Sequence, residues 1–171
     1  MFLLQMAGFP GSGKSAIAQL IAKHTNSIVI DRDVIKSSML SSGIKDQLLA
    51  DASYLVVFDL AAYYLSKGNS VIIDTPCYYK VTVDKGLELC KEYNSVYKYI
   101  ECKVDSYEEI ERRIKTRKYL ATQISEITRD GYNNALDKSV KPTNIDTLVV
   151  NSTSDKHYDM DIVLNYINKN K

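Results

Sequence analysis

The chain has 171 residues, of which 45% are hydrophobic and 25% are charged, and its formal net charge is +1. This length predicts a single domain, residues 1–171, that buries a substantial core. The near-neutral charge excludes a molecule that binds polyanions over its whole surface, and the ordinary composition excludes a disordered or low-complexity chain.

The three cysteines, Cys77, Cys90 and Cys102, are odd in number and widely spaced. This pattern favours reduced, mostly buried thiols over a disulfide framework or a zinc site. Residues 1–7 are apolar and carry no basic leader, and we find no run that approaches the ~20 apolar residues of a membrane span. We therefore expect a cytoplasmic protein without a membrane partner.

The first element is a buried strand, because residues 2–7 form a short apolar run. The spacing of Ile17, Leu20 and Ile21 then predicts one face of a helix. Between strand and helix, residues 8–15 have the sequence Gly-Phe-Pro-Gly-Ser-Gly-Lys-Ser. This is the P-loop pattern of a glycine, four residues and then Gly-Lys-Ser, in the required strand-to-helix context.

This loop predicts a site for the phosphates of ATP. Its glycines allow the backbone N–H groups to approach a phosphate at the positive end of the following helix. Lys14 can reach the β- and γ-phosphates, and the Ser15 hydroxyl can ligate Mg²⁺. The alternative, a glycine-rich turn capped by serine, leaves the flanking strand and helix without a role. The expected nucleotide-binding residues are Gly8, Pro10, Gly11, Ser12, Gly13, Lys14 and Ser15.

Two further apolar runs, residues 27–31 and 70–74, predict buried strands that each end in an aspartate. Helical patterns at about 32–41 and 46–66 separate these strands. Ligands of open α/β sheets gather beyond the carboxyl ends of the strands. The polar residues that follow these two strands are therefore placed where a substrate would bind.

The remaining pattern continues the alternation of helices and strands. We expect helices at about 80–93, from Ser106 onward, at 124–138 and at 158–168, and strands at 97–104 and 147–151. Such alternation specifies a parallel sheet with right-handed crossovers. The expected fold is α/β, a three-layer P-loop NTPase fold with a five-stranded parallel sheet.

Three of the five arginines lie within the helix after Ser106 or at its end. Pairs of Glu108 with Arg112, Glu109 with Arg113 and Glu111 with Lys115 would make it an ordinary solvated helix, each pair worth about 0.2–0.5 kcal/mol. These pairs leave Arg117 unexplained, because its neighbour four residues back is Arg113, a like charge. An anion between the two arginines would explain the spacing, so we expect Arg113 and Arg117 to form a lid over the phosphates.

A kinase also needs a carboxylate that orients the attacking hydroxyl and accepts its proton. Asp31, Asp33 and Asp74 are the candidates. Asp31 could hold a loop, Asp33 could be only the N-cap of the next helix, and Asp74 could ligate the water shell of Mg²⁺. The residues alone leave these alternatives open.

Taken together, these motifs resemble the kinase module of bacteriophage polynucleotide kinase and its small relatives among the P-loop kinases, which include antibiotic phosphotransferases and zeta-type toxins. The motifs are residues 8–15, Asp-Arg-Asp-Val-Ile-Lys at 31–36, Ile-Asp-Thr at 73–75 and Arg-Ile-Lys-Thr-Arg at 113–117. The resemblance covers most of the chain, and only the phosphate loop is specific when taken alone.

The resemblance implies particular roles. The aspartate of Arg32-Asp33 would be the general base, and Asp74 and Thr75 would contact the acceptor. Lys36 stands where the kinase module has an arginine that contacts an acceptor phosphate. The resemblance also implies that the adenine lies near the loop at 151–155.

The function expected from the sequence is an ATP-dependent kinase that transfers the γ-phosphoryl group to a hydroxyl of a polynucleotide end or of a small molecule. Its catalytic residues would be Lys14, Asp33, Arg113 and Arg117, and its substrate-binding residues Arg32, Lys36, Asp74 and Thr75. The alternative is a nucleotide-binding switch or toxin-like partner protein with weak ATPase activity.

Overall fold

The computed structural model describes residues 1–117, 120–137, 140–153 and 159–169. Its strands are β1 (Phe2–Ala7), β2 (Ile28–Asp31), β3 (Val71–Asp74), β4 (Val96–Lys103) and β5 (Thr147–Asn151). Its helices are α1 (Lys14–Thr25), α2 (Arg32–Ser41), α3 (Asp46–Ser66), α4 (Lys80–Glu92), α5 (Tyr107–Thr116), α6 (Arg129–Asp137) and α7 (Met160–Asn168). Strands and helices alternate along most of the chain, as the sequence predicts.

The strands form one sheet in the order β2-β3-β1-β4-β5, and every neighbouring pair is parallel. The central strand β1 pairs Leu3 with Val71 of β3 and with Tyr97 of β4. All residues of β1 and β3 are buried, which agrees with their mainly apolar sequences, in which Gln5 and Asp74 are the polar residues. The expected P-loop fold with a five-stranded parallel sheet is confirmed.

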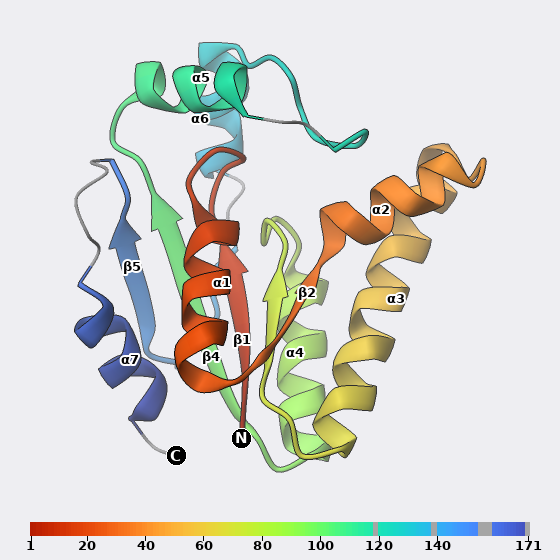
Figure 1. Ribbon diagram of the computed structural model, residues 1–171, viewed down its shortest axis with the longest axis vertical. Coiled ribbons are helices and arrows are strands. Elements are labelled where there is room, and N and C mark those ends of the chain that lie inside the picture. Colours follow the sequence, from red (N-terminus) through yellow and green to blue (C-terminus); the bar gives the residue numbers. More distant parts are fainter. Residues whose placement is uncertain (118–119, 138–139, 154–158, 170–171) are drawn as a thin grey trace.

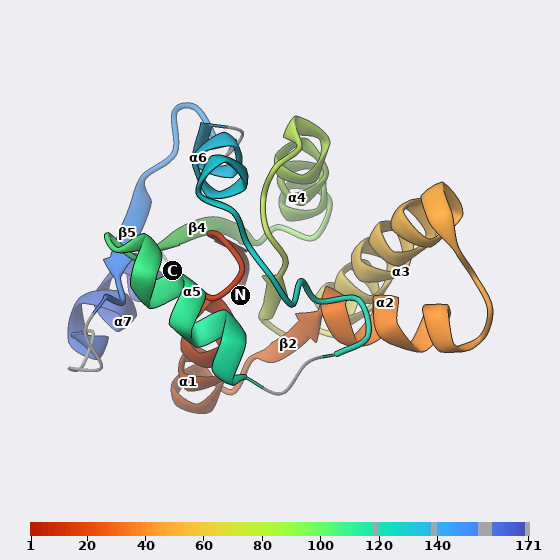
Figure 2. The same cartoon turned by 90° about the horizontal axis from the view of Figure 1, so that it is seen from above.

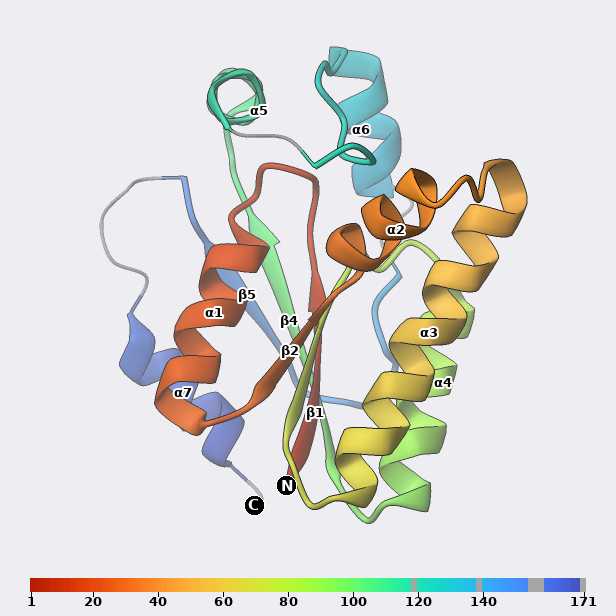
Figure 3. The same cartoon turned by 45° about the vertical axis from the view of Figure 1, so that its right-hand side comes forward.

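Helices cover both faces of the sheet, which gives three layers (Figures 1 and 3). On one face α1 and α7 pack on the sheet through Ile17, Ile21, Val163 and Ile167. On the other face α3 and α4 contribute Val57, Ala61, Leu65 and Leu89, among others, to a second cluster. Cys77, Cys90 and Cys102 are free and buried, as expected.

By length and composition alone, α3 is long and apolar enough to cross a membrane, which differs from the expectation that no segment approaches this length. In the structure α3 lies against β2, β3 and α2. Its residues Leu49, Val57, Ala61 and Leu65 are buried in the core. One stripe of the helix therefore faces the core, while Leu48, Leu55 and Tyr63 are exposed.

Beyond the carboxyl ends of the strands, α5 and α6 form a layer above the sheet (Figures 1 and 2). The expected helix at 124–138 starts later, at Arg129, and residue 138 lies outside the described residues. The Thr128 hydroxyl accepts a hydrogen bond from the Gly131 backbone N–H at 3.1 Å and so caps the first turn. Residues 124–128, which were expected to be helical, form no helix.

Candidate active site

The loop between β1 and α1 has the backbone that a phosphate cradle needs. Gly8, Gly11 and Gly13 have φ angles of 131°, 87° and 82°, a region that other residues rarely adopt. A Cβ at Gly8 would lie 2.3 Å from the Cys102 carbonyl oxygen, so a side chain there would push β1 from β4. No side chain caps the start of α1, so its first N–H groups face the loop.

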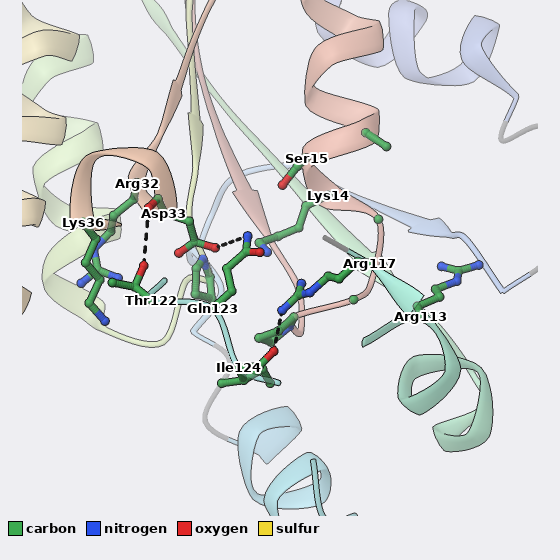
Figure 4. A pocket seen from close by; sticks show the side chains of 15 residues that line it. Lys14, Ser15, Arg32, Asp33, Lys36, Arg113, Arg117, Thr122, Gln123 and Ile124 are labelled. Atoms are coloured by element: carbon green, nitrogen blue, oxygen red, sulfur yellow. Dashed lines mark hydrogen bonds between the residues drawn. The ribbon is translucent and has the colours of Figure 1, made fainter. Parts of the chain in front are cut away.

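A cleft of about 440 Å³ opens beside this loop. It is formed where the loop, the start of α2, the end of α5 and the segment after α5 meet (Figure 4). Its lining comprises Pro10, Gly11, Gly13, Lys14, Ser15, Ala16, Arg32, Asp33, Lys36, Pro76, Arg113, Arg117, Thr122, Gln123 and Ile124. Gly8 and Ser12 lie on the other side of the loop and line a neighbouring hollow.

All four residues expected to be catalytic, Lys14, Asp33, Arg113 and Arg117, line the cleft. Lys14 is 8% exposed and extends from the start of α1 toward Asp33, while Arg117 enters from α5 (Figure 4). Ser15, the next residue of α1, also lines the cleft. A cation, a carboxylate and a guanidinium from three distant parts of the chain thus face one space.

Asp33 is free to face the cleft because another residue caps α2. The carboxylate of Asp31 accepts hydrogen bonds from the backbone N–H groups of Asp33 and Val34, at 2.8 Å and 3.4 Å. The N-cap is therefore Asp31, and the alternative that Asp33 is the cap is wrong. The Asp33 carboxylate instead accepts a hydrogen bond from Gln123 Nε2 at 3.0 Å.

Asp31 and Asp74 end neighbouring strands and are paired in register. Asp74 is 4% exposed, and its Oδ1 has no hydrogen-bond partner among the described residues. Burial, and then the charge of Asp74, raise the pKa of Asp31. Two adjacent carboxylates that repel each other in this way form a site that a cation would stabilise.

These oxygens suit Mg²⁺, which prefers oxygen ligands and shares them with substrate phosphates and water. The Ser15 hydroxyl and the Asp74 carboxylate are the protein groups that would hold it. Asp74 and the next residue, Thr75, do not line the cleft itself. Both are buried behind it at the end of β3, and the Thr75 hydroxyl donates to the Pro76 carbonyl at 2.9 Å.

Replacement of Asp31 by Asn tests this carboxylate pair. Asparagine caps a helix about as well as aspartate, so the change removes repulsion from Asp74 and keeps the cap. A carboxyl whose pKa is raised in the folded state lowers stability as the pH rises through that pKa, and the neutral asparagine removes this loss. We expect Asp31→Asn to melt at a higher temperature than the metal-free wild type at pH 7, with the difference closing below about pH 4. Equal melting curves at pH 7 would contradict the repulsion.

Arg32 and Lys36 line the side of the cleft next to Asp33 (Figure 4). Arg32 is 7% exposed, and its guanidinium lies 3.7 Å from the centre of the Tyr54 ring. Its Nε has no hydrogen-bond partner among the described residues. Burial, and then the charge of Arg32, lower the pKa of Lys36, while Asp33 opposes the shift. Two cations held this close favour an anion beside them.

The two lid arginines have different surroundings. Arg113 binds the Glu109 carboxylate at 2.6 Å and donates to the Ser152 carbonyl at 2.5 Å, so its guanidinium turns away from Asp33 (Figure 4). Arg117 donates from Nη2 to the Ile124 carbonyl at 2.9 Å and points into the cleft. The structure thus joins Arg113 to the loop after β5 and directs only Arg117 toward Asp33.

The ion pairs of α5 differ in part from those expected. Glu109 with Arg113 and Glu111 with Lys115 form as the sequence predicts. Arg112, however, pairs with Glu109, and Glu108 pairs with Arg129 of α6. The neighbouring helix α6 supplies this last partner, which the spacing within one helix cannot reveal.

Sequence reasoning missed Thr122 and Gln123, which contact Asp33 and α2 from the segment after α5. The sequence pattern assigns no element to them, and only their polar character and their position shortly after Arg117 distinguish them. Of the loop at 151–155, residues 151–153 are described, and Ser152 is buried against the phosphate loop, where its Oγ donates to the Ser12 carbonyl.

A phosphate loop that joins the first strand to the first helix of a parallel sheet ordered 2-3-1-4-5 defines a P-loop nucleotide-binding protein. A family model described as "AAA domain" matches residues 3–140, and the chain belongs to that family. No curated protein matches the chain significantly.

Solved structures share this fold. A protein of Chloroflexus aurantiacus described as a candidate kinase has a TM-score of 0.76 and 20% identity, with 97% of this chain and 96% of that chain covered. A sugar kinase of Janibacter has a TM-score of 0.68 and 14% identity, with coverages of 98% and 94%. The APS kinase of Mycobacterium tuberculosis in complex with AMPPNP and APS has a TM-score of 0.64 and 16% identity, with coverages of 97% and 96%.

Proposed function

We propose that the protein is an ATP-dependent kinase that phosphorylates a hydroxyl group of a small, anionic molecule. The observation that carries this proposal is the convergence of Lys14, Asp33 and Arg117 on one cleft beside the phosphate loop. Phosphoryl transfer needs mainly positioning and neutralisation of charge, which these groups can supply. This function would also explain why the Asp33 carboxylate, which does not cap α2, faces the cleft.

In the proposed reaction, the N–H groups of the loop and Lys14 bind the β- and γ-phosphates of ATP. Asp33 orients the acceptor hydroxyl and takes its proton as the oxygen attacks the γ-phosphorus. The bond between that phosphorus and the bridging oxygen breaks, and ADP leaves. Arg117 stabilises the negative charge on the phosphoryl group in transit. Mg²⁺, held by Ser15 and Asp74, would neutralise charge on the phosphates.

The size of the cleft favours a small acceptor over a polynucleotide end. At about 440 Å³ it is within the range of small-molecule pockets, and it must accommodate both the terminal phosphate and the acceptor. Residues 122–124 form one of its walls. The names of two structural neighbours, a sugar kinase and an APS kinase, agree with an acceptor of this size.

Arg32 and Lys36 favour an acceptor that carries a carboxylate, phosphate or sulfate near the reacting hydroxyl. We expect Lys36→Ala to raise the KM for such an acceptor about tenfold and to leave the KM for ATP within twofold, since a hydrogen bond between charged groups contributes about 1.5–3 kcal/mol. Initial rates at varied acceptor and fixed ATP measure this. The matched control is Lys23→Ala, which replaces an exposed lysine of α1. An unchanged acceptor KM in Lys36→Ala would remove this residue from the acceptor site.

Transfer of label from γ-labelled ATP tests the proposed function. The panel contains hydroxy acids, phosphorylated and uncharged sugars, nucleosides, aminoglycosides and oligonucleotides with 5′-hydroxyl ends. We expect label in an anionic small molecule and little in the oligonucleotides. Label found only as free phosphate over the whole panel would favour the second function, a nucleotide-binding switch or toxin-like partner protein with weak ATPase activity.

A further inference from the structure

The segment after the lid helix, which we call the strap (residues 120–124), lies on α2 beside the proposed general base. The Thr122 hydroxyl lies 2.9 Å from that of Ser37, and the Thr122 backbone N–H donates to the same Ser37 oxygen at 3.3 Å. Figure 2 shows the chain leaving α5, passing beside the start of α2 and returning to α6. The strap therefore connects parts of the chain that are 85 or more residues apart.

Within the strap, hydrogen bonds hold both the backbone and the side-chain amide of Gln123. Its Oε1 accepts a hydrogen bond from the Leu120 backbone N–H at 3.3 Å, and its own backbone N–H donates to the Leu120 carbonyl at 3.0 Å. This turn leaves the amide nitrogen facing the Asp33 carboxylate, to which it donates at 3.0 Å. The strap's own backbone thus determines which end of the amide meets Asp33.

This hydrogen bond restricts the carboxylate on which the proposed reaction depends. Among the described residues, no other hydrogen-bond donor contacts the Asp33 carboxylate oxygens, and Gln123 takes only Oδ2. A carboxylate held by one oxygen keeps the other available, with less freedom to rotate. Such preorientation is what a general base needs, because small displacements of a reacting group slow the reaction.

The strap also holds the lid arginine. Arg117 donates from Nη2 to the carbonyl of Ile124, the residue after Gln123. The same short segment therefore touches the proposed base with a side chain and the proposed phosphate-binding arginine with its backbone (Figure 4). Docking of the strap on α2 would bring both groups into place in one step.

From these contacts we propose that Gln123 is a positioning residue, which orients Asp33 toward the acceptor hydroxyl while the docked strap sets Arg117. The inference rests on the proposed function, in which Asp33 is the base. The competing explanation is that Gln123 only fills space beneath the lid. The two explanations differ in what they require of residue 123: positioning requires its N–H donor, whereas filling requires only its shape.

A double-mutant cycle separates them. Gln123→Glu keeps the shape of the side chain and replaces the donor by a second carboxylate, and Gln123→Ala removes both shape and donor. We expect each to lower kcat for labelled transfer about tenfold or more and to change the KM for ATP by less than twofold. In an Asp33→Ala background, the same two changes are expected to have no further effect. The matched control is Gln47→Ala, which replaces an exposed glutamine that donates a hydrogen bond to Asp51 on α3.

Wild-type kcat in Gln123→Glu would overturn the inference, as would equal losses in the wild-type and Asp33→Ala backgrounds. If no acceptor in the panel is labelled, the same variants are compared by their rates of ATP hydrolysis, measured as released phosphate. The same changes in kcat are expected, and the same results would overturn the inference. A second measurement, hydrogen exchange of the strap's backbone amides with AMPPNP bound, does not depend on turnover. Asp33→Ala is expected to speed exchange at residues 120–124 severalfold. Unchanged exchange would show that the contact is absent in solution, whatever the activity of the protein.

Discussion

Replacement of Arg117 by Ala is expected to lower kcat about a thousandfold and to leave the affinity for nucleotide within a fewfold of that of the wild type. An arginine directed at a transferring phosphoryl group contributes about 10³ or more to the rate, mostly in the transition state. The lysine and backbone amides of the phosphate loop remain, so ground-state binding survives. Single-turnover transfer from γ-labelled ATP and titration with a fluorescent ATP analogue measure the two quantities.

The control for this change is Arg112→Ala. Arg112 is an exposed arginine of the same helix, it binds Glu109 and it does not line the cleft. Its loss is expected to leave turnover within twofold of the wild type. Wild-type turnover in Arg117→Ala would remove the arginine from the reaction, and a loss of nucleotide affinity with kcat unchanged would assign it to ground-state binding alone.

Replacement of Asp33 by Asn has the second large effect. General base catalysis contributes about 10²–10⁴ to a rate, and asparagine has nearly the same shape but cannot take the proton. The fold should tolerate the change because the cap of α2 is Asp31. We expect kcat to fall at least a hundredfold while the melting temperature and the KM for ATP stay close to those of the wild type.

For comparison, Asp84→Asn changes a half-buried aspartate of α4 that pairs with Lys80 and does not line the cleft. Its rate should match that of the wild type. A rate for Asp33→Asn within twofold of the wild type would show that another group accepts the proton. Asp31 and Asp74 would then be the next residues to replace.

The parts of this site that the sequence predicts are those built from neighbouring residues. The phosphate loop is one continuous motif, and Asp31 and Asp74 follow apolar runs, so parallel pairing brings them to the same edge of the sheet. Arg117 stands out because its spacing from Arg113 has no local explanation. Each of these features needs only short-range patterns and the rule that strands of a parallel sheet end together.

The parts that the sequence does not reveal are contacts between distant segments. Gln123 meets Asp33 across 90 residues, and no spacing rule connects them. Whether Asp31 or Asp33 caps α2 depends on whether the helix begins two residues earlier or later. Helix propensity does not determine a boundary that finely. The contact between Arg113 and Ser152 joins residues 39 positions apart, so local spacing does not reveal it either.

The proposed kinase reaction depends on a single arrangement, in which Lys14, Asp33 and Arg117 surround the γ-phosphate of one bound nucleotide. A crystal structure with AMPPNP and Mg²⁺ tests it most directly. We expect the γ-phosphate within hydrogen-bond distance of Lys14 and Arg117, with Asp33 facing it across a gap that an acceptor hydroxyl would fill. A γ-phosphate bound elsewhere, or Asp33 directed away from it, would contradict the proposed kinase site.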